Sequence, residues 1–320
     1  MSANPGERPS STAPDAGGDP EEWRHETAHV NGVSLHYVRV DPDPATVDGA
    51  TEPPLVVCLH GFPEFWYAWR HQLSPLADAG FRVVAPDMRG YNRSSKPAGV
   101  ASYRPGELVG DVRGLVEGLG YARTHLVGHD WGGLVAWEVA IREPDLLDRL
   151  VVLNAPHPER YRQTLRQSPR QVLRSWYAVA AQVPWLPERL LRANDLAAVG
   201  RMLSDTARPG AFSETEIERY KRAMATEGTM TAALNYYRAQ FREGVGRELR
   251  ALVGRDRDTT VRVPTMVVWG EQDRALGTEL LDGFEDFVPG LRVERLPEAS
   301  HWVQADEPDR VTDLLLDFLD

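Results

Sequence analysis

Residues 124–133 join an apolar run that predicts a β-strand to a sharp turn flanked by glycines, with the sequence THLVGHDWGG. Glycine adopts backbone conformations that other residues rarely adopt, so the pattern predicts a strained reversal from strand to helix. Such a turn presents one side chain at the open end of a mostly parallel sheet, and here that side chain is Asp130. The structural alternative is that Asp130 only caps the following helix, since aspartate is a favoured N-cap residue.

The residue type at this turn restricts the chemistry. A serine there attacks acyl carbon, whereas at a saturated carbon it would form an ether that water does not readily cleave. An aspartate forms an alkyl ester, whose carbonyl belongs to the enzyme and can be hydrolysed afterwards. Asp130 therefore indicates hydrolysis of a carbon–oxygen or carbon–halogen bond and argues against a serine-type esterase.

The composition is that of an ordinary globular protein, with 320 residues, 42% of them hydrophobic and 26% charged. A formal net charge of -11 disfavours nucleic acid and anionic membrane surfaces as partners. The only cysteine, Cys58, lies in an apolar run and is expected to be a buried strand residue, which excludes an internal disulfide or a cysteine-rich metal site. No metal or cofactor is predicted, and no apolar run is long enough to cross a bilayer.

Short apolar strands alternate with helical stretches along most of the chain, a pattern typical of an α/β fold with a mostly parallel central sheet flanked by helices. A hairpin is predicted at Asn31-Gly32, followed by strands at residues 55–59, 82–85, 124–127, 150–153, 265–269 and 292–295. The strand rhythm stops over residues 156–254, which predicts a helical cap inserted into a core of residues 23–155 and 255–320. Residues 1–22 resemble a disordered tail rather than a signal peptide, so the cytoplasm is the expected location.

Hydrolysis of an alkyl ester requires a base for water, an acid to orient that base, and donors for the oxyanion. His301 follows the last predicted strand in a turn-like segment and is the candidate base. Asp273 follows the strand at 265–269 and is the favoured orienting acid, with Glu271 as its competitor. The chain order of nucleophile, acid and base is the order expected for a triad on this type of sheet.

Two backbone N–H groups are candidates for the oxyanion hole. The strand at 55–59 runs into residues 60–64, HGFPE, where Gly61 permits a tight turn that can aim the Phe62 N–H inward. The Trp131 N–H, directly after the nucleophile, would complete the pair. The alternative for His60-Gly61 is a plain turn, because glycine often punctuates loops.

The leaving group decides what else the site needs. A halide leaves without a proton and favours N–H donors, whereas an epoxide oxygen departs as an alkoxide and needs an acid. A tyrosine can supply that proton, since its reference pKa of ~10 keeps it protonated at neutral pH. Tyr177 and Tyr237, both in the helical segment, are the favoured pair.

The sequence resembles the α/β-hydrolase-fold epoxide hydrolases over roughly residue 22 to the C-terminus, and more loosely the haloalkane dehalogenases, which share the aspartate turn. The resemblance rests on HGFPE (60–64), Trp66, Trp69-Arg70, PDMRGY (86–91), GHDWGG (128–133), NAPHP (154–158), SWY (175–177), NYYR (235–238), GEQD (270–273) and His301-Trp302. It implies that Asp130 is the nucleophile, that Asp273 and His301 complete the triad, and that Tyr177 and Tyr237 hold the epoxide oxygen. The carry-over to Tyr237 rather than Tyr236 rests on the tyrosine that directly precedes the arginine. Asn92 departs from the glycine more usual at its position, but asparagine tolerates positive φ better than most residues, so the turn should survive.

The sequence therefore predicts a cofactor-independent epoxide hydrolase acting on a small-molecule epoxide. Its pocket is predicted to include His60, Pro63, Trp131 and Trp176, and the tyrosines favour reading Trp131 as an apolar wall rather than a halide ligand. The alternatives are a haloalkane dehalogenase with the same triad and a catalytically silent binding protein. The oligomeric state stays open, with a homodimer among the options.

Overall fold

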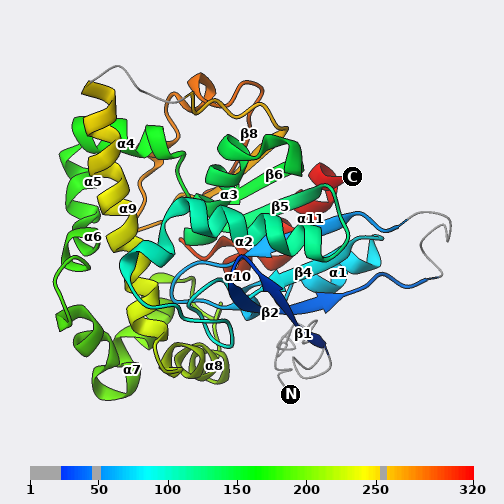
Figure 1. Cartoon of the computed structure of the whole chain (residues 1–320), viewed down its shortest axis with the longest axis horizontal. Coiled ribbons are helices and arrows are strands. Elements are labelled where there is room, and N and C mark those ends of the chain that lie inside the picture. Colours follow the sequence, from blue (N-terminus) through cyan, green and yellow to red (C-terminus); the bar gives the residue numbers. More distant parts are fainter. Residues whose placement is uncertain (1–22, 45–51, 253–257) are drawn as a thin grey trace, which may run out of the picture.

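The computed structural model describes residues 23–44, 52–252 and 258–320, so the predicted tail at residues 1–22 lies outside the described residues. The central sheet has eight strands in the order β1-β2-β4-β3-β5-β6-β7-β8 (Figure 1). Pairing is antiparallel at β1–β2 and β2–β4 and parallel elsewhere. Their bounds are β1 (Arg24–Val30), β2 (Val33–Val40), β3 (Leu55–Leu59), β4 (Arg82–Pro86), β5 (Thr124–His129), β6 (Leu147–Leu153), β7 (Thr265–Gly270) and β8 (Arg292–Leu296). The predicted fold class is confirmed.

The predicted strands are all present, and five of them run longer than predicted. β6 begins three residues early, because Leu147 pairs with Thr124 across a register shift before the apolar run starts. The predicted hairpin is also confirmed: Asn31 and Gly32 have φ of 46° and 74°, the positive values that a tight two-residue connection requires. Asn92 has a φ of 39°, so asparagine adopts here the positive φ for which glycine is more usual. Its side-chain amide donates a hydrogen bond to Asp87, and this bond closes the turn.

Helices cover both faces of the sheet, which is why its inner strands are apolar without alternation. α2 (Pro105–Gly118) and α3 (Trp131–Arg142) pack on one face, and α1 (Leu73–Asp78) and α11 (Pro308–Leu319) pack on the other, next to α10 (Val303–Asp306). Leu126 of β5 joins the first of these cores and Val127 the second. Burying each such side chain stabilises the fold by roughly 2 kcal/mol. Short 3-10 turns lie at Trp66–Trp69, Val100–Tyr103, Pro144–Leu146, Thr278–Leu280 and Phe284–Asp286.

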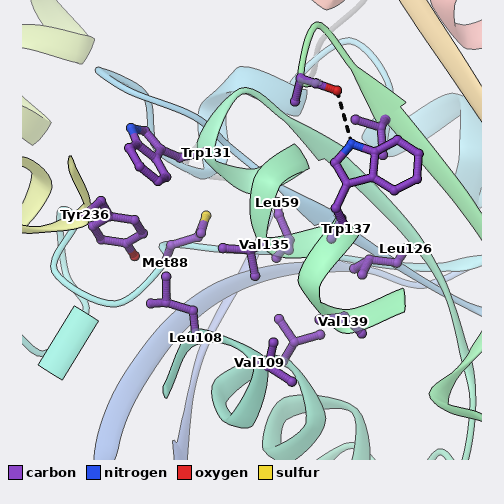
Figure 2. Close-up of a cluster of buried hydrophobic side chains, with 14 of the residues drawn as sticks. Leu59, Met88, Leu108, Val109, Leu126, Trp131, Val135, Trp137, Val139 and Tyr236 are labelled. Atoms are coloured by element: carbon purple, nitrogen blue, oxygen red, sulfur yellow. Dashed lines mark hydrogen bonds between the residues drawn. The ribbon is translucent and has the colours of Figure 1, made fainter. Parts of the chain in front are cut away.

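The core between α2 and α3 supports the nucleophile turn from below. Leu108 and Val109 of α2 meet Val135 and Val139 of α3 there (Figure 2). The Trp137 indole N–H donates to the carbonyl of Ala155 at 3.1 Å, which ties α3 to the loop after β6. Helix α3 therefore has little freedom to move relative to the sheet. Cys58 is buried in β3, as predicted.

The chain between β6 and β7 forms a group of helices at one end of the sheet (Figure 1). They are α4 (Pro158–Gln167), α5 (Pro169–Arg174), α6 (Trp176–Ala180), α7 (Leu186–Thr206), α8 (Glu214–Ala225) and α9 (Thr229–Leu252). Helix α7 is broken at 193–196, where the backbone leaves helical geometry. We propose that residues 156–254 form the predicted cap, of which 253 and 254 lie outside the described residues. No helix in the described part of the chain is long and apolar enough to span a membrane.

Candidate active site

Asp130 occupies the sharp turn between β5 and α3, with φ 48° and ψ -116°. A residue other than glycine rarely adopts positive φ, and such strain is typical of functional turns. A side chain on Gly132 would collide with the carbonyl oxygens of Leu59 and His60, so only glycine lets the turn approach β3 this closely. Asp130 stands at the N-cap position of α3, yet its side chain makes no capping hydrogen bond. Its carboxylate is turned to other partners.

The loop after β3 provides the first of these partners. The Phe62 N–H donates to Asp130 Oδ2 at 2.9 Å. The Trp131 N–H also acts as a hydrogen-bond donor to this carboxylate. The two N–H groups predicted for the oxyanion hole therefore both donate to the Asp130 carboxylate. The other oxygen, Oδ1, faces His301.

His301 lies on the loop after β8, between two carboxylates. Its Nδ1 is 2.6 Å from Asp273 Oδ2, and its Nε2 is 3.7 Å from Asp130 Oδ1. Asp273 accepts further hydrogen bonds from the Asn154 amide at 2.8 Å and from the N–H groups of Ala275 and Leu276, which fix its orientation. The competing acid Glu271 instead pairs with Arg295 at 2.7 Å and does not contact His301.

The charges of these three groups are coupled. Burial disfavours a charged His301, but the attraction of Asp273 and Asp130 outweighs it and raises the pKa of His301 to about 9. Burial likewise opposes ionisation of Asp273, yet the charge of His301 and its own hydrogen bonds hold the pKa of Asp273 below the usual value. Burial dominates at Asp130 and raises its pKa. In the free protein the imidazole is therefore protonated at neutral pH.

A cavity of about 380 Å³ opens above this group, between the core and the proposed cap. Tyr177 of α6 and Tyr237 of α9 line it, with ring centroids 5.9 Å apart. Burial raises the pKa of both tyrosines well above the usual value, so each hydroxyl stays protonated. The charge of Asp130 contributes to both increases, and Asp130 lines the same cavity as the two tyrosines. Tyr236, by contrast, is buried and donates to the carbonyl of Arg89 at 2.7 Å.

Three residues predicted for the pocket do not line this cavity, which is a correction. His60 is fully buried, accepts from the Met88 N–H at 3.0 Å and so anchors its loop. Pro63 is buried within that loop. Trp131 packs edge-on against Tyr237, with centroids 4.7 Å apart, and points its indole N–H toward the Tyr237 hydroxyl. It lies between the two tyrosines of α9 rather than at the cavity wall. Trp176 does line the cavity and is also exposed at its rim.

A buried polar network behind Asp130, Asp273 and His301 was not anticipated from the sequence. Glu64 Oε2 accepts from the Gly61 N–H and contacts His129 Nδ1, both at 2.8 Å, while Oε1 accepts from the Gln304 amide at 2.9 Å. His129 Nε2 lies 2.8 Å from the carbonyl oxygen of His301. The network thus ties the loop of Phe62 to the loop of His301. Glu64 lies in the motif HGFPE and His129 in GHDWGG. A polar side chain next to the apolar end of a strand was the only sign in the sequence of a functional role for these two residues. Nothing in the sequence pointed to Gln304.

Comparisons with known proteins identify the family of the chain. A family model described as the alpha/beta hydrolase fold matches residues 54–308. The AB hydrolase superfamily protein YfhM of Bacillus subtilis is 38% identical, over 91% of this chain and 96% of that protein. Epoxide hydrolase 3 of Xenopus tropicalis is 36% identical, over 90% of this chain and 75% of that protein.

Solved structures give the same result. The structure of a Bacillus megaterium epoxide hydrolase in complex with an inhibitor has a TM-score of 0.80 and 33% identity, and the match covers 92% of this chain and 99% of that one. The resemblance seen in the sequence motifs is therefore confirmed. The chain belongs to the epoxide hydrolases of the α/β-hydrolase fold, a family of hydrolytic enzymes.

Proposed function

We propose that this enzyme converts an epoxide and water into a vicinal diol through a covalent alkyl ester on Asp130. The observation that carries the proposal is that a carboxylate at a strained turn, two protonated tyrosines and a charged imidazole all line one cavity. The Xenopus tropicalis relative and the Bacillus megaterium structure described above carry the name epoxide hydrolase, which supports the same reaction class. The haloalkane dehalogenase remains the alternative.

The first step is ring opening. Because Oδ2 of Asp130 is held by the Phe62 N–H, Oδ1 is the oxygen free to attack carbon. A carbon–oxygen bond forms to Oδ1 as the ring carbon–oxygen bond breaks, and the electron pair of that bond stays on the ring oxygen. Tyr177 and Tyr237 hydrogen-bond this oxygen, and one of them donates a proton to it.

The second step is hydrolysis of the ester. Once Asp130 is alkylated it carries no charge, so His301 loses one of the two carboxylates that raise its pKa. The imidazole then returns its proton to the tyrosinate left by ring opening and can accept one from water, with Asp273 holding its orientation. As the tetrahedral intermediate collapses, the bond between the carbonyl carbon and Oδ1 breaks, and the departing alkoxide takes the proton of the new carboxyl group, which leaves Asp130 ionised and His301 charged again. The 3.7 Å between Nε2 and Oδ1 marks where water must enter to attack the ester carbonyl carbon. The N–H groups of Phe62 and Trp131 stabilise the oxyanion that forms on Oδ2.

This mechanism uses side chains and water alone, and we propose no cofactor for it. A halide would need N–H donors, and the indole of Trp131, the residue after Asp130, directs its N–H toward Tyr237 instead. This favours the epoxide over the haloalkane. The cytoplasmic location and the absence of a nucleic-acid partner remain predictions of the sequence.

The test is to trap the ester. His301→Gln should accumulate an adduct of the mass of the epoxide on the peptide carrying Asp130, found by rapid quench and mass spectrometry. Tyr177→Phe and Tyr237→Phe should instead slow adduct formation by about 10²- to 10⁴-fold. The control His29→Gln, an exposed histidine of β1, should turn over normally.

Isotope labelling gives an independent check. Repeated turnover by the unaltered enzyme in heavy-oxygen water should place label in Asp130, because water attacks the ester carbonyl. An unlabelled Asp130 after many turnovers would reject the covalent route. Turnover of chlorinated or brominated alkanes without turnover of epoxides would favour the dehalogenase.

A further inference from the structure

The outer surface of α5, α6 and α7 carries large apolar side chains that the fold leaves exposed. Figure 1 shows these helices along the edge of the molecule farthest from the strands. Five of the side chains are 62% to 75% exposed: Leu173, Trp176, Val179, Trp185 and Leu190. We call this set the cap face. Five large apolar side chains exposed along three consecutive helices are more than the single scattered ones that need no explanation, and such groups often mark binding surfaces.

The side chains of the cap face are grouped by helix geometry. Leu173, Trp176 and Val179 follow one another at intervals of three residues, which places them on one side of α5 and α6. Trp185 precedes α7, and Leu190 lies one turn further on. Trp176 and Leu190 also line the catalytic cavity, so the cap face continues into its rim. A molecule lying on the cap face would be next to the cavity entrance.

The charge around the cap face is opposite in sign to that of the whole chain. Residues 163–194 contain five arginines and a single acid, although the chain as a whole has a net charge of -11. That acid, Glu188, is buried and paired with Arg238 at 2.7 Å. Arg170, Arg189 and Arg192 are exposed beside the apolar side chains. The net charge of the whole chain argued against an anionic surface as partner. Exposed charges interact mainly within a Debye length, however, so the local arginine cluster determines the interaction of the cap face with a surface that it touches.

We propose that the cap face binds the surface of an anionic lipid bilayer, with its tryptophans and leucines in the interface and its arginines against the lipid phosphates. Tryptophan and arginine flanking exposed aliphatic side chains is the composition of protein surfaces that lie in membrane interfaces. A second copy of the chain fits less well, because a two-fold interface would bring the same arginine cluster against itself. Bound in this way, the enzyme would take lipophilic substrates from the membrane directly into the cavity.

Vesicle sedimentation tests the proposal and does not depend on the catalytic mechanism. The full-length protein should sediment with vesicles of phosphatidylcholine and phosphatidylglycerol in equal parts, and far less with phosphatidylcholine alone. Binding should weaken as salt rises from about 0.01 M to about 1 M, because the Debye length falls from about 30 Å to about 3 Å. Equal binding to both vesicle types, or none to either, would overturn the proposal.

Matched variants locate the binding surface. Arg170→Glu combined with Arg192→Glu should weaken anionic-vesicle binding by about 25-fold or more, at about fivefold for each arginine. The charge-reversal control Arg262→Glu, on the exposed segment before β7, should have little effect. Equal weakening by the control would refute the assignment to the cap face.

The apolar part is tested by Leu173→Asp combined with Trp185→Asp. Neither residue lines the catalytic cavity, so hydrolysis of a small water-soluble epoxide and the melting temperature should stay unchanged while vesicle binding is lost. Val293→Asp, at an exposed position of the edge strand β8, is the matched control. If the unaltered protein is a dimer by light scattering and this double variant is a monomer, the cap face is a self-interface and the membrane proposal is wrong.

Discussion

The charge on Asp130 should control the basicity of His301, and Asp130→Asn isolates that effect. Asparagine has the shape of aspartate but no charge, so it imitates the electrostatic state of the alkyl ester. In the unaltered enzyme two carboxylates raise the pKa of His301 to about 9. Removing one of them while keeping the Asp273 contact should lower that pKa.

The size of the decrease follows from the distance between the two groups. Nε2 of His301 and Oδ1 of Asp130 are 3.7 Å apart. Two unit charges at that separation attract by about 1 kcal/mol in bulk water and by about 4 kcal/mol at an effective dielectric constant of about 20. Since one pKa unit corresponds to about 1.4 kcal/mol, the pKa of His301 should fall to roughly 6–8 in the variant. At the lower end of this range the imidazole would be mostly neutral at physiological pH.

Nuclear magnetic resonance of histidine labelled with ¹⁵N in the ring measures this directly, after mass spectrometry has shown that the amide at position 130 is intact. The control is Asp148→Asn, which removes a carboxylate at the start of β6, the end of the strand opposite the site. It should leave the His301 titration in place. An unchanged His301 titration in Asp130→Asn would refute the electrostatic coupling, and with it our account of how the imidazole becomes a base only after the ester has formed.

Two further predictions concern the support of the site. Glu64→Gln removes a buried charge that binds three donors and should destabilise the protein by about 2 kcal/mol in urea unfolding, with Glu285→Gln, an exposed glutamate, as a neutral control. Burial opposes ionisation of Glu64, but His129 holds its pKa below the usual value. The difference in unfolding free energy between the unaltered protein and Glu64→Gln should therefore shrink as the pH falls below about 4. A difference that grows on acidification would contradict this. Gly132→Ala should lower the free energy of unfolding by about 3 kcal/mol or more, because the new methyl group would overlap two backbone carbonyls near β3. In the control Gly118→Ala, the new methyl group would meet only a methyl group at 3.7 Å, so this change should be tolerated. Equal melting temperatures of the two variants would refute the close approach at Gly132.

The sheet was largely predictable because its strands are short, apolar and separated by turn residues. The hydrophobic pattern alone predicted the strands of the parallel part of the sheet, and the Asn31-Gly32 turn predicted the hairpin. Strand ends were less accurate, since ladder hydrogen bonds continue through residues such as Asp148 and Arg149 that are only half-buried. The break in α7 at 193–196 was not predicted, because no proline or glycine marks it and the tolerance of Asn194 and Asp195 for positive φ is a weaker signal.

Within the site, the sequence identified groups by their position at strand ends but not the direction of each side chain. Asp130, Asp273 and His301 follow three strands whose carboxyl ends share one edge, so their proximity could be inferred. Trp131 follows the nucleophile directly, yet the helix turns its indole away from the cavity and against Tyr237. The choice between Tyr236 and Tyr237 likewise depends on helix rotation, which adjacent residues in a sequence do not reveal.

The buried network explains why such a site needs more than its reacting groups. The oxyanion donor and the base lie on loops 239 residues apart in the chain, at positions 62 and 301, and no strand pairing joins β3 to β8. Catalytic geometry must hold to within about 0.5 Å, which loops alone rarely provide. Glu64 fixes the first loop through the Gly61 N–H, and His129 reaches the His301 carbonyl, so one buried carboxylate and one imidazole join both loops beneath the nucleophile. A charged group at zero exposure is costly, and its presence here is consistent with selection for position rather than for stability.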